Sequence, residues 1–459
     1  MKLKLRHAWT DTFRSLHVRN FRLFFVSQLI SQIGNWLTMV ALTLLVLKLT
    51  NDGVAIGFLA AAQFGPVLVI GPWAGLIADR SDKRKLLIIV QSIAMAQSFV
   101  LAALAFSGSP PLWAIYAVAV VGGITVAFDN PARRAFVVEM VTEEGMNNAV
   151  SLNSAAMTSS RVFGPALAGL LVITVGFGWA FLVDGLSYIA VLIGLSMMRT
   201  SELRPSPVAP RAKGQVRAGL RYARSVPDLW VPLVMMAVVG TFAYNFQTVF
   251  PLFVTRSLGG SDTTFTLLLS VVSVGALFGA LATARRKTID VRMVALTSLA
   301  FGASLTVMTF VPNAAVAFPV GLFVGLGSIA FLTASTAIVQ IRSDPMMRGR
   351  VLALQAMVFL GSTPIGGPIV GWICQNIGPR YGVAIGAVAA LGAGVWGLFK
   401  ARSCSPAESL AATDAVKSVE LAIADLDDDT SEADEECEPR PAPRPAPVDQ
   451  GARTALPTS

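Results

Sequence analysis

Long apolar runs separated by short polar connections dominate the chain up to Lys400. There are twelve of these runs, each of roughly 18 to 25 residues, which is enough to cross about 30 Å of hydrocarbon as an α-helix. Barrel strands would instead show about ten alternating residues, so the pattern predicts an all-α polytopic membrane protein. The predicted spans are 21–47, 54–78, 85–106, 111–130, 148–174, 178–198, 230–254, 263–284, 292–311, 315–338, 350–374 and 381–400.

Basic residues gather in every second connection between these spans. They occur in 80–85, 133–134, 199–228, 285–292 and 342–350, whereas the other connections are short and nearly uncharged. By the positive-inside rule, the basic connections and both termini are expected in the cytoplasm. The protein is therefore expected to be a multi-pass protein of the plasma (inner) membrane.

The longest internal connection divides the spans six and six. This gives a cytoplasmic N-terminus (1–19), an N-terminal half (20–198), a linker (199–228), a C-terminal half (229–400) and a tail (401–459). Part of the linker, 214–225, is expected to form a basic amphipathic helix along the membrane surface. The tail is acidic and then repeats Pro-Arg-Pro-Ala, a composition that favours a disordered cytoplasmic segment.

Composition supports the membrane class and excludes others. The chain is 54% apolar and 14% charged, with a mean hydropathy of +0.65. The net charge of +9 comes from the basic connections and reflects topology rather than nucleic-acid binding. Both histidines precede the first span, the three cysteines form no disulfide framework, and no Gly-x-x-x-x-Gly-Lys loop is present. No metal, cofactor or enzymatic activity is therefore expected.

One connection carries a recognisable motif, Gly75-Leu-Ile-Ala-Asp-Arg-Ser-Asp-Lys-Arg-Lys85. It resembles the signature between helices 2 and 3 of the major facilitator superfamily, with Asp82 in place of the usual turn glycine. The stretches 20–36, 130–136, 161–169 and 348–351 resemble the enterobactin-exporter and macrolide-efflux (drug:proton antiporter) branch. The resemblance implies two pseudo-symmetric six-helix halves in a lipid-embedded monomer that exports small molecules, driven by proton entry.

The resemblance also implies a gate at the cytoplasmic side. There the Asp79 carboxylate would accept hydrogen bonds at the start of helix 11, closing this side when the protein faces outward. The alternative is a cluster of charges that only sets topology. The expected gate residues are Gly75, Asp79, Arg80, Arg84, Arg348 and Arg350.

Two polar stripes predict a substrate cavity. Gln28, Gln32 and Asn35 share one face of helix 1, and Tyr244 and Asn245 lie on helix 7. If helices 1 and 7 meet across the symmetry axis, both stripes line the cavity between the halves. The alternative is polar contact between packed helices.

Charges within the spans are candidates for proton coupling. Arg161 and Asp184 are expected at similar depths on successive antiparallel helices, and a lone charge there costs about 3 kcal/mol or more, so we expect them to pair. The pair is either structural or opened by substrate or proton during transport. Asp129 is expected near the cytoplasmic helix end, as a cap or gate contact rather than a proton site.

Gly164 and Pro165 resemble the helix 5 signature of antiporters. Glycine permits close contact and proline removes a backbone donor, so a bend packed against the other half is expected.

These features together predict a secondary exporter of small, drug-, macrolide- or siderophore-like molecules. An importer or uniporter is the alternative within transport. A membrane receptor or scaffold that acts through the tail is the alternative outside it.

Overall fold

The computed structural model of the chain describes residues 14–204, 215–286 and 289–403, apart from the side chains of Asp79 and a few other residues in these ranges. Every regular element in the described ranges is helical. The predicted N-terminus up to residue 13, the Pro-rich part of the linker (205–214) and the predicted tail from residue 404 lie outside them.

Twelve spans in the described residues are long and apolar enough to cross a membrane, as the hydropathy pattern predicts. The first six helices (the first half) and those after residue 226 (the second half) are joined through α8 (Gln215–Ser225). The first half consists of α2 (Arg19–Thr50), α3 (Gly53–Arg80), α4 (Lys83–Phe106), α5 (Leu112–Met140), α6 (Glu143–Thr174) and α7 (Phe177–Ser196). The second consists of α9 (Pro227–Ala243), α10 (Phe246–Leu252), the π-turn η3 (Phe253–Ser257), α11 (Asp262–Ala284), α12 (Val291–Thr309), α13 (Ala314–Arg342), α14 (Pro345–Asn376) and α15 (Pro379–Ser403). Short 3-10 turns η1 (Arg14–His17) and η2 (Thr200–Glu202) flank the first half.

Side-chain caps explain several helix starts. Asp52 accepts a hydrogen bond from Val54 N at 2.9 Å at the start of α3. Asp82 accepts one from Lys85 N at 3.0 Å at the start of α4. A carboxylate at this position satisfies an orphan helix N–H, so Asp82 can stand where the superfamily signature has glycine.

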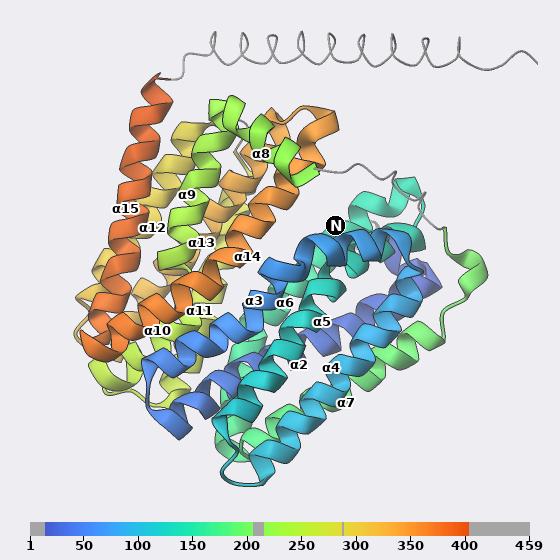
Figure 1. Cartoon of the computed structure of the whole chain (residues 1–459), viewed down its shortest axis with the longest axis horizontal. Coiled ribbons are helices and arrows are strands. Elements are labelled where there is room, and N and C mark those ends of the chain that lie inside the picture. Colours follow the sequence, from blue (N-terminus) through green and yellow to red (C-terminus); the bar gives the residue numbers. More distant parts are fainter. Residues whose placement is uncertain (1–13, 205–214, 287–288, 404–459) are drawn as a thin grey trace, which may run out of the picture. The chain divides into compact units, whose positions relative to one another are not determined.

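Most helices pack within their own half. In the first half α2 lies against α6 and α7, and α5 against α3 and α4; in the second, α11 lies against α13 and α12 against α15. The main contacts between the halves are α3 with α14 and α6 with α11, the two crossing pairs, and α10 also contacts α2 and α3. Figure 1 shows α3 beside α14.

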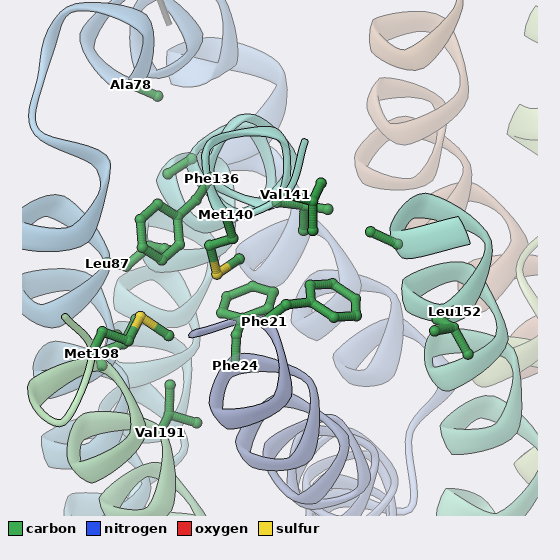
Figure 2. Packing of buried hydrophobic residues seen from close by; sticks show 14 residues of the cluster. Phe21, Phe24, Ala78, Leu87, Phe136, Met140, Val141, Leu152, Val191 and Met198 are labelled. Carbon is green, nitrogen blue, oxygen red and sulfur yellow. The ribbon is translucent and has the colours of Figure 1, made fainter. Parts of the chain in front are cut away.

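An apolar cluster fixes α2 within the first half (Figure 2). Phe24 meets Phe136 of α5 edge to face, with ring centroids 5.8 Å apart. Leu87 of α4 and Val191 of α7 belong to the same cluster. Such aromatic contacts favour one arrangement of the helices over others, so α2, α4, α5 and α7 are held together where this cluster lies.

Several helix boundaries differ from the prediction. The predicted span 111–130 continues as α5 to Met140, and 148–174 begins earlier, at Glu143. The predicted span 230–254 is broken at Tyr244 and Asn245. A span predicted from hydropathy ends at the first charged residues, whereas the helix itself continues where those charged residues find partners.

The linker helix is observed as α8, close to the predicted 214–225. It packs on α9 and α14, and the hydroxyl of Tyr222 accepts a hydrogen bond from Asp344 N at 3.0 Å. Its position along a membrane surface stays a prediction.

Candidate functional site

A cavity of about 240 Å³ lies between the two halves. Its wall combines residues of α2, α3 and α6 with residues of α10, α11, α13 and α14 and of the break between α9 and α10. Among the described lining residues one, Arg161, is charged, and most of the others are apolar or aromatic. An apolar cavity with a few polar groups is typical of a small-molecule site. The residues that define its chemistry are Trp36, Phe64, Arg161, Tyr244, Asn245 and Phe359.

The break in the seventh span positions Tyr244 and Asn245 in this wall. Asn245 has backbone angles φ −85° and ψ 41°, outside the helical region. Its side-chain Nδ2 donates to Thr241 O at 2.6 Å, the carbonyl that a continuous helix would bond through the backbone N–H of Asn245. Asn245 Oδ1 is buried and has no partner among the described residues. The break therefore leaves a free acceptor beside the cavity.

Tyr244 contacts three helices of the second half at the cavity wall. Its hydroxyl donates to Ser328 O of α13 at 2.5 Å. Its ring meets Phe359 of α14 edge to face, with centroids 5.1 Å apart, and lies 5.5 Å from the ring of Phe301 in α12. These contacts hold the Tyr244 side chain against α12, α13 and α14.

Arg161 brings a positive charge to the first-half wall of the cavity. Its Cζ atom lies 6.0 Å from the centroid of the Trp36 ring, a cation–π arrangement. Within the described ranges no hydrogen bond or ion pair of Arg161 is found. The predicted Arg161–Asp184 pair is therefore not present in this structure.

Asp184 instead lies inside the first half, 1% exposed. Its Oδ2 accepts hydrogen bonds from the hydroxyl of Thr38 at 2.6 Å and from that of Ser98 at 2.8 Å. Its Oδ1 has no partner among the described residues. Similar depth did not bring Arg161 and Asp184 together, because rotation about the helix axes turns them toward different neighbours.

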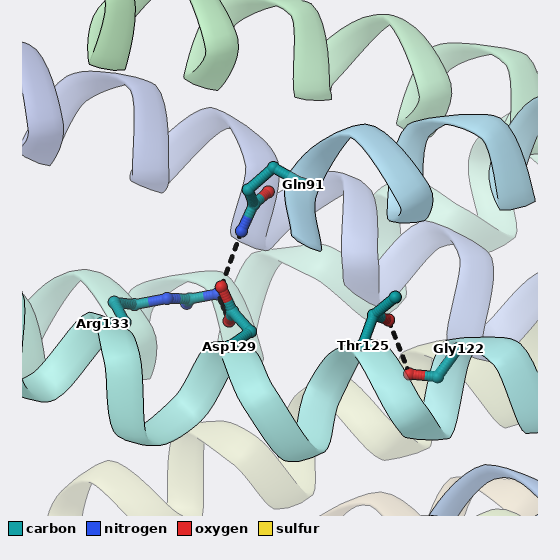
Figure 3. Close-up of polar contacts among 5 residues, drawn as sticks. All are labelled: Gln91, Gly122, Thr125, Asp129 and Arg133. Atoms are coloured by element: carbon teal, nitrogen blue, oxygen red, sulfur yellow. Dashed lines mark hydrogen bonds and ion pairs between the residues drawn. The ribbon is translucent and has the colours of Figure 1, made fainter. Parts of the chain in front are cut away.

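Asp129 is not at a helix end, contrary to the prediction. It is buried within α5 and pairs with Arg133 one turn later, while Gln91 Nε2 of α4 donates to it at 2.7 Å (Figure 3). The pair and its hydrogen bond lower the cost of burying charge. A polar network thus occupies the interior of the first half.

The predicted polar stripe of helix 1, which is α2 in the structure, faces this interior. Gln32 and Asn35 line a smaller cavity with Gln91 and Asp129, away from the second half. Gln28 is 3% exposed, and neither of its amide atoms has a partner in the part of the chain that the structure describes. Of the predicted cavity residues, Tyr244 and Asn245 line the central cavity, and the three on helix 1 do not.

The backbones of α3 and α14 are in contact at one end of the spans, which we call the closed end. A Cβ atom at Gly57 would lie 2.5 Å from Gly367 O and 2.7 Å from Pro368 Cα, so no other side chain fits there without movement. Gly53 faces Gly371 in the same way. The two helices carry the spacing Gly-x-x-x-Gly, at 53 and 57 and at 367 and 371, which allows close helix contact.

Further contacts hold the closed end together. Gly53 N donates to Gln375 Oε1 at 3.0 Å, and Arg256 of η3 donates to Asn51 O. On the other crossing pair, a Cβ at Gly169 of α6 would overlap Thr266 of α11. Both α3–α14 and α6–α11 are therefore in close contact at this end.

The helix bend motif is placed differently. Gly164 faces Trp36 of α2, in the same half, and not the second half as predicted. Pro165 lies inside α6. The absence of a side chain at Gly164 lets Trp36 approach α6, which places its ring beside Arg161.

At the opposite end the glycines on the same helix faces contact nothing in the part of the chain that the structure describes. Gly71 and Gly75 follow Gly53 and Gly57 by 18 residues, and Gly349 precedes Gly367 by 18 residues. Eighteen residues make about five helical turns, so the glycines of each helix share one face. Yet Cβ atoms at Gly71, Gly75 and Gly349 would meet nothing within 4 Å. The two helices therefore diverge toward this open end.

The predicted gate residues lie at the open end. Arg348 is exposed, Arg80 and Arg350 are half-buried, and Arg350 donates to Met347 Sδ at 3.2 Å. The side chain of Asp79 lies outside the described part. Its contact with the start of α14 stays a prediction.

Two other charges of the motif are used within the first half. Arg84 donates to Leu195 O at 2.7 Å and to Ser196 O at 3.3 Å, the last carbonyls of α7. Lys83 pairs with Glu139 at 3.0 Å, each side chain being 7% exposed. The sequence pattern treated Lys83 as a loop charge and missed this buried pair.

Known proteins resemble the whole membrane region. The family model described as "Transmembrane secretion effector" (MFS_3) matches residues 10–429. The staphyloferrin A transporter of Staphylococcus aureus is 25% identical over 77% of this chain and 89% of its own length. Macrolide efflux protein A of Streptococcus pyogenes is 24% identical over 79% and 91%.

Solved structures share the fold at lower identity. A bacterial homolog of the human lysosomal transporter Spinster has a TM-score of 0.62 at 15% identity, covering 83% of this chain and 95% of that one. A POT family transporter in complex with 5-aminolevulinic acid has a TM-score of 0.70 at 9% identity, covering 84% and 96%. The chain belongs to the transmembrane secretion effector family of the major facilitator superfamily and is a multi-pass secondary transporter, not an enzyme.

Proposed function

We propose that the protein exports a small amphipathic molecule across the cell membrane by alternating access, driven by proton entry. The observation that carries the proposal is the cavity between the halves, with α3 and α14 in contact at one end and apart at the other. A central site that opens to one side at a time is what alternating access requires.

The distribution of basic residues supports an orientation. The charged connections, including 80–85 and 342–350, lie at the open end. By the positive-inside rule this end faces the cytoplasm, as do both termini. The structure then represents the inward-facing state, in which substrate enters from the cytoplasm.

The outward-facing state would close the open end. Rocking of the halves would bring the face of Gly71 and Gly75 onto the start of α14 near Gly349, with Asp79 beside Arg348. The same motion would separate Gly57 from Gly367.

Asp184 is the candidate proton site. One of its oxygens is buried without a partner, and the other holds Thr38 of α2. The same helix carries Trp36 and Met39 into the cavity wall. Protonation of Asp184 would weaken the hydrogen bond that it accepts from Thr38 and would so loosen the contact between α2 and α7. Asp129, which is ion-paired, would serve structure rather than proton transfer.

Two relatives carry names that support transport of small molecules, one for staphyloferrin A transport and one for macrolide efflux, and the second name supports export. The test uses inverted membrane vesicles with an imposed proton gradient and labelled erythromycin or staphyloferrin A. Proton-driven accumulation of either compound inside the vesicles is expected. Accumulation of neither, or gradient-driven depletion as an importer would give, would contradict the proposal.

The proton site is tested in the same vesicles. Asp184→Asn should abolish the dependence of transport on the gradient while exchange of substrate continues. Asp52→Asn is the matched control, because asparagine can still cap α3 through the same acceptor position. Coupling that survives in Asp184→Asn at normal expression would refute the role of Asp184.

A further inference from the structure

We propose that the transported molecule is an amphipathic organic anion whose acidic group binds the guanidinium of Arg161. This inference rests on the transport function proposed above and names the substrate class of the same cavity. It is drawn from the charge and the unused hydrogen-bonding groups of the cavity wall.

The described cavity wall carries a positive charge and no acid to balance it. Arg161 is its one charged residue, and the remaining residues are apolar, aromatic or neutral polar. A guanidinium has five N–H donors and no acceptor. Among the described residues (14–204, 215–286 and 289–403), none accepts a hydrogen bond from these donors.

Two buried acids of the first half already have partners. Asp184 accepts from Thr38 and Ser98, and Asp129 is paired with Arg133. If a carboxylate of the protein were paired with Arg161, the guanidinium would not be available to bind an anionic ligand. Here that position is open to a ligand.

Other arginines that lie over aromatic rings differ from Arg161. Arg380 lies over Phe253 but donates to Thr309 O at 2.6 Å. Arg224 lies over Trp230 and is exposed. A ring face attracts the cation without using its N–H groups, so of these three only Arg161 lines the cavity with its donors unused.

The rest of the wall fits the apolar body of such an anion. Phe64 and Trp36 face the cavity from the first half, and Phe246 and Phe359 from the second. On the second-half side Asn245 Oδ1 is a buried acceptor without a partner. The wall therefore suits a molecule with an acidic group, an aromatic or aliphatic body and a hydrogen-bond donor. A carboxylate or sulfonate bound by arginine takes up two parallel N–H···O bonds.

The test compares three dansyl compounds that share one fluorescent body. Dansyltaurine carries a sulfonate, dansylcholine a quaternary ammonium, and dansylamide no charge. Binding to the purified full-length transporter is measured by fluorescence. The wild type is expected to bind dansyltaurine more tightly than either other compound, by roughly tenfold or more.

Variants assign this preference to the guanidinium. Arg161→Gln should lower the affinity for dansyltaurine to that for dansylamide, and Arg161→Lys should retain part of the preference. Arg224→Gln is the matched control, since it removes an arginine over a tryptophan outside the cavity, and it should bind like the wild type.

Several results would overturn the inference. These are equal or tighter binding of dansylcholine, an anion preference that persists in Arg161→Gln, or no binding of any compound at millimolar concentration. If Arg161→Gln does not fold, the wild-type order of the three compounds still decides. Proton-driven export of a cationic compound in vesicles would overturn the anion inference and leave the proposed transport standing, whereas absence of all transport would remove the proposed function itself.

Discussion

Replacing Gly57 by alanine adds one methyl group at the closest backbone contact between the halves. The added Cβ would lie 2.5 Å from Gly367 O, whereas ordinary contact begins at 3.4 Å. The backbones of α3 and α14 must therefore separate by about 0.9 Å. Overpacking of this kind costs about 1–3 kcal/mol, and the cost applies only while the closed end is closed.

The expected result is a shift toward the outward-facing state. A penalty of about 1–3 kcal/mol on one state changes the ratio of the two states by about 5- to 150-fold. The shift can be measured as a change in distance between spin labels at Ser109, in the connection after α4, and Asn376, the last residue of α14, which lie at the closed end in opposite halves. The labels are placed in a background that lacks the three native cysteines.

Gly65→Ala is the matched control on the same helix. A Cβ at Gly65 meets no described atom within 4 Å, and alanine gains about 1 kcal/mol of helix propensity at either site. That gain is the same in both states and does not move their ratio. If Gly57→Ala and Gly65→Ala give the same distance distribution, the glycine contact does not control closure and the reasoning fails.

Three further predictions follow from the same geometry. Gly75→Leu should favour the inward-facing state, opposite in sign to Gly57→Ala, because its side chain has space only while the open end is open; an unchanged distance between labels at that end would contradict this. Arg133→Leu should lower thermal stability in detergent by about 3–5 kcal/mol, because it leaves the Asp129 carboxylate buried without its ion pair, and Asp129→Asn in the same chain should restore part of the loss; no loss in the single variant would contradict it. Tyr244→Phe should cost about 0.5–1.5 kcal/mol of stability through its lost hydrogen bond and should weaken binding at the cavity wall, both measurable with the purified protein; unaltered melting and binding would refute the role of this hydroxyl.

Sequence periodicity was a reliable guide to the number and type of the spans. Hydrocarbon thickness fixes the length of an apolar run, and a lipid environment admits only structures that satisfy their own backbone. Twelve runs therefore predict twelve membrane spans, and the described residues contain twelve helical spans long and apolar enough to cross a membrane. The motif at 75–85 was likewise enough to indicate the superfamily, since its residues are local in the chain.

Helix boundaries were less predictable where charges are buried. α5 continues past Asp129 because Arg133 lies one turn away and pairs with it. The break at Asn245 needed the side chain to replace a lost backbone bond. Neither event changes the mean hydropathy of a window, so the pattern could not reveal them.

The sequence by itself determined the class of protein, the spans and the polar residues available to a cavity, because these depend on local composition and on spacing along one helix. Only the tertiary structure decided which partner each of them meets. Gln32 and Asn35 line a cavity inside the first half and Gln28 is buried, Asp184 accepts hydrogen bonds from hydroxyls, and Arg161 lines the central cavity over Trp36. The physical reason is that the depth of a residue in the membrane follows from its position along its helix. Which neighbour it contacts depends on how the helix is rotated about its axis and on how closely two helices approach. In this chain close approach is set by glycines more than 300 residues apart, such as Gly57 and Gly367.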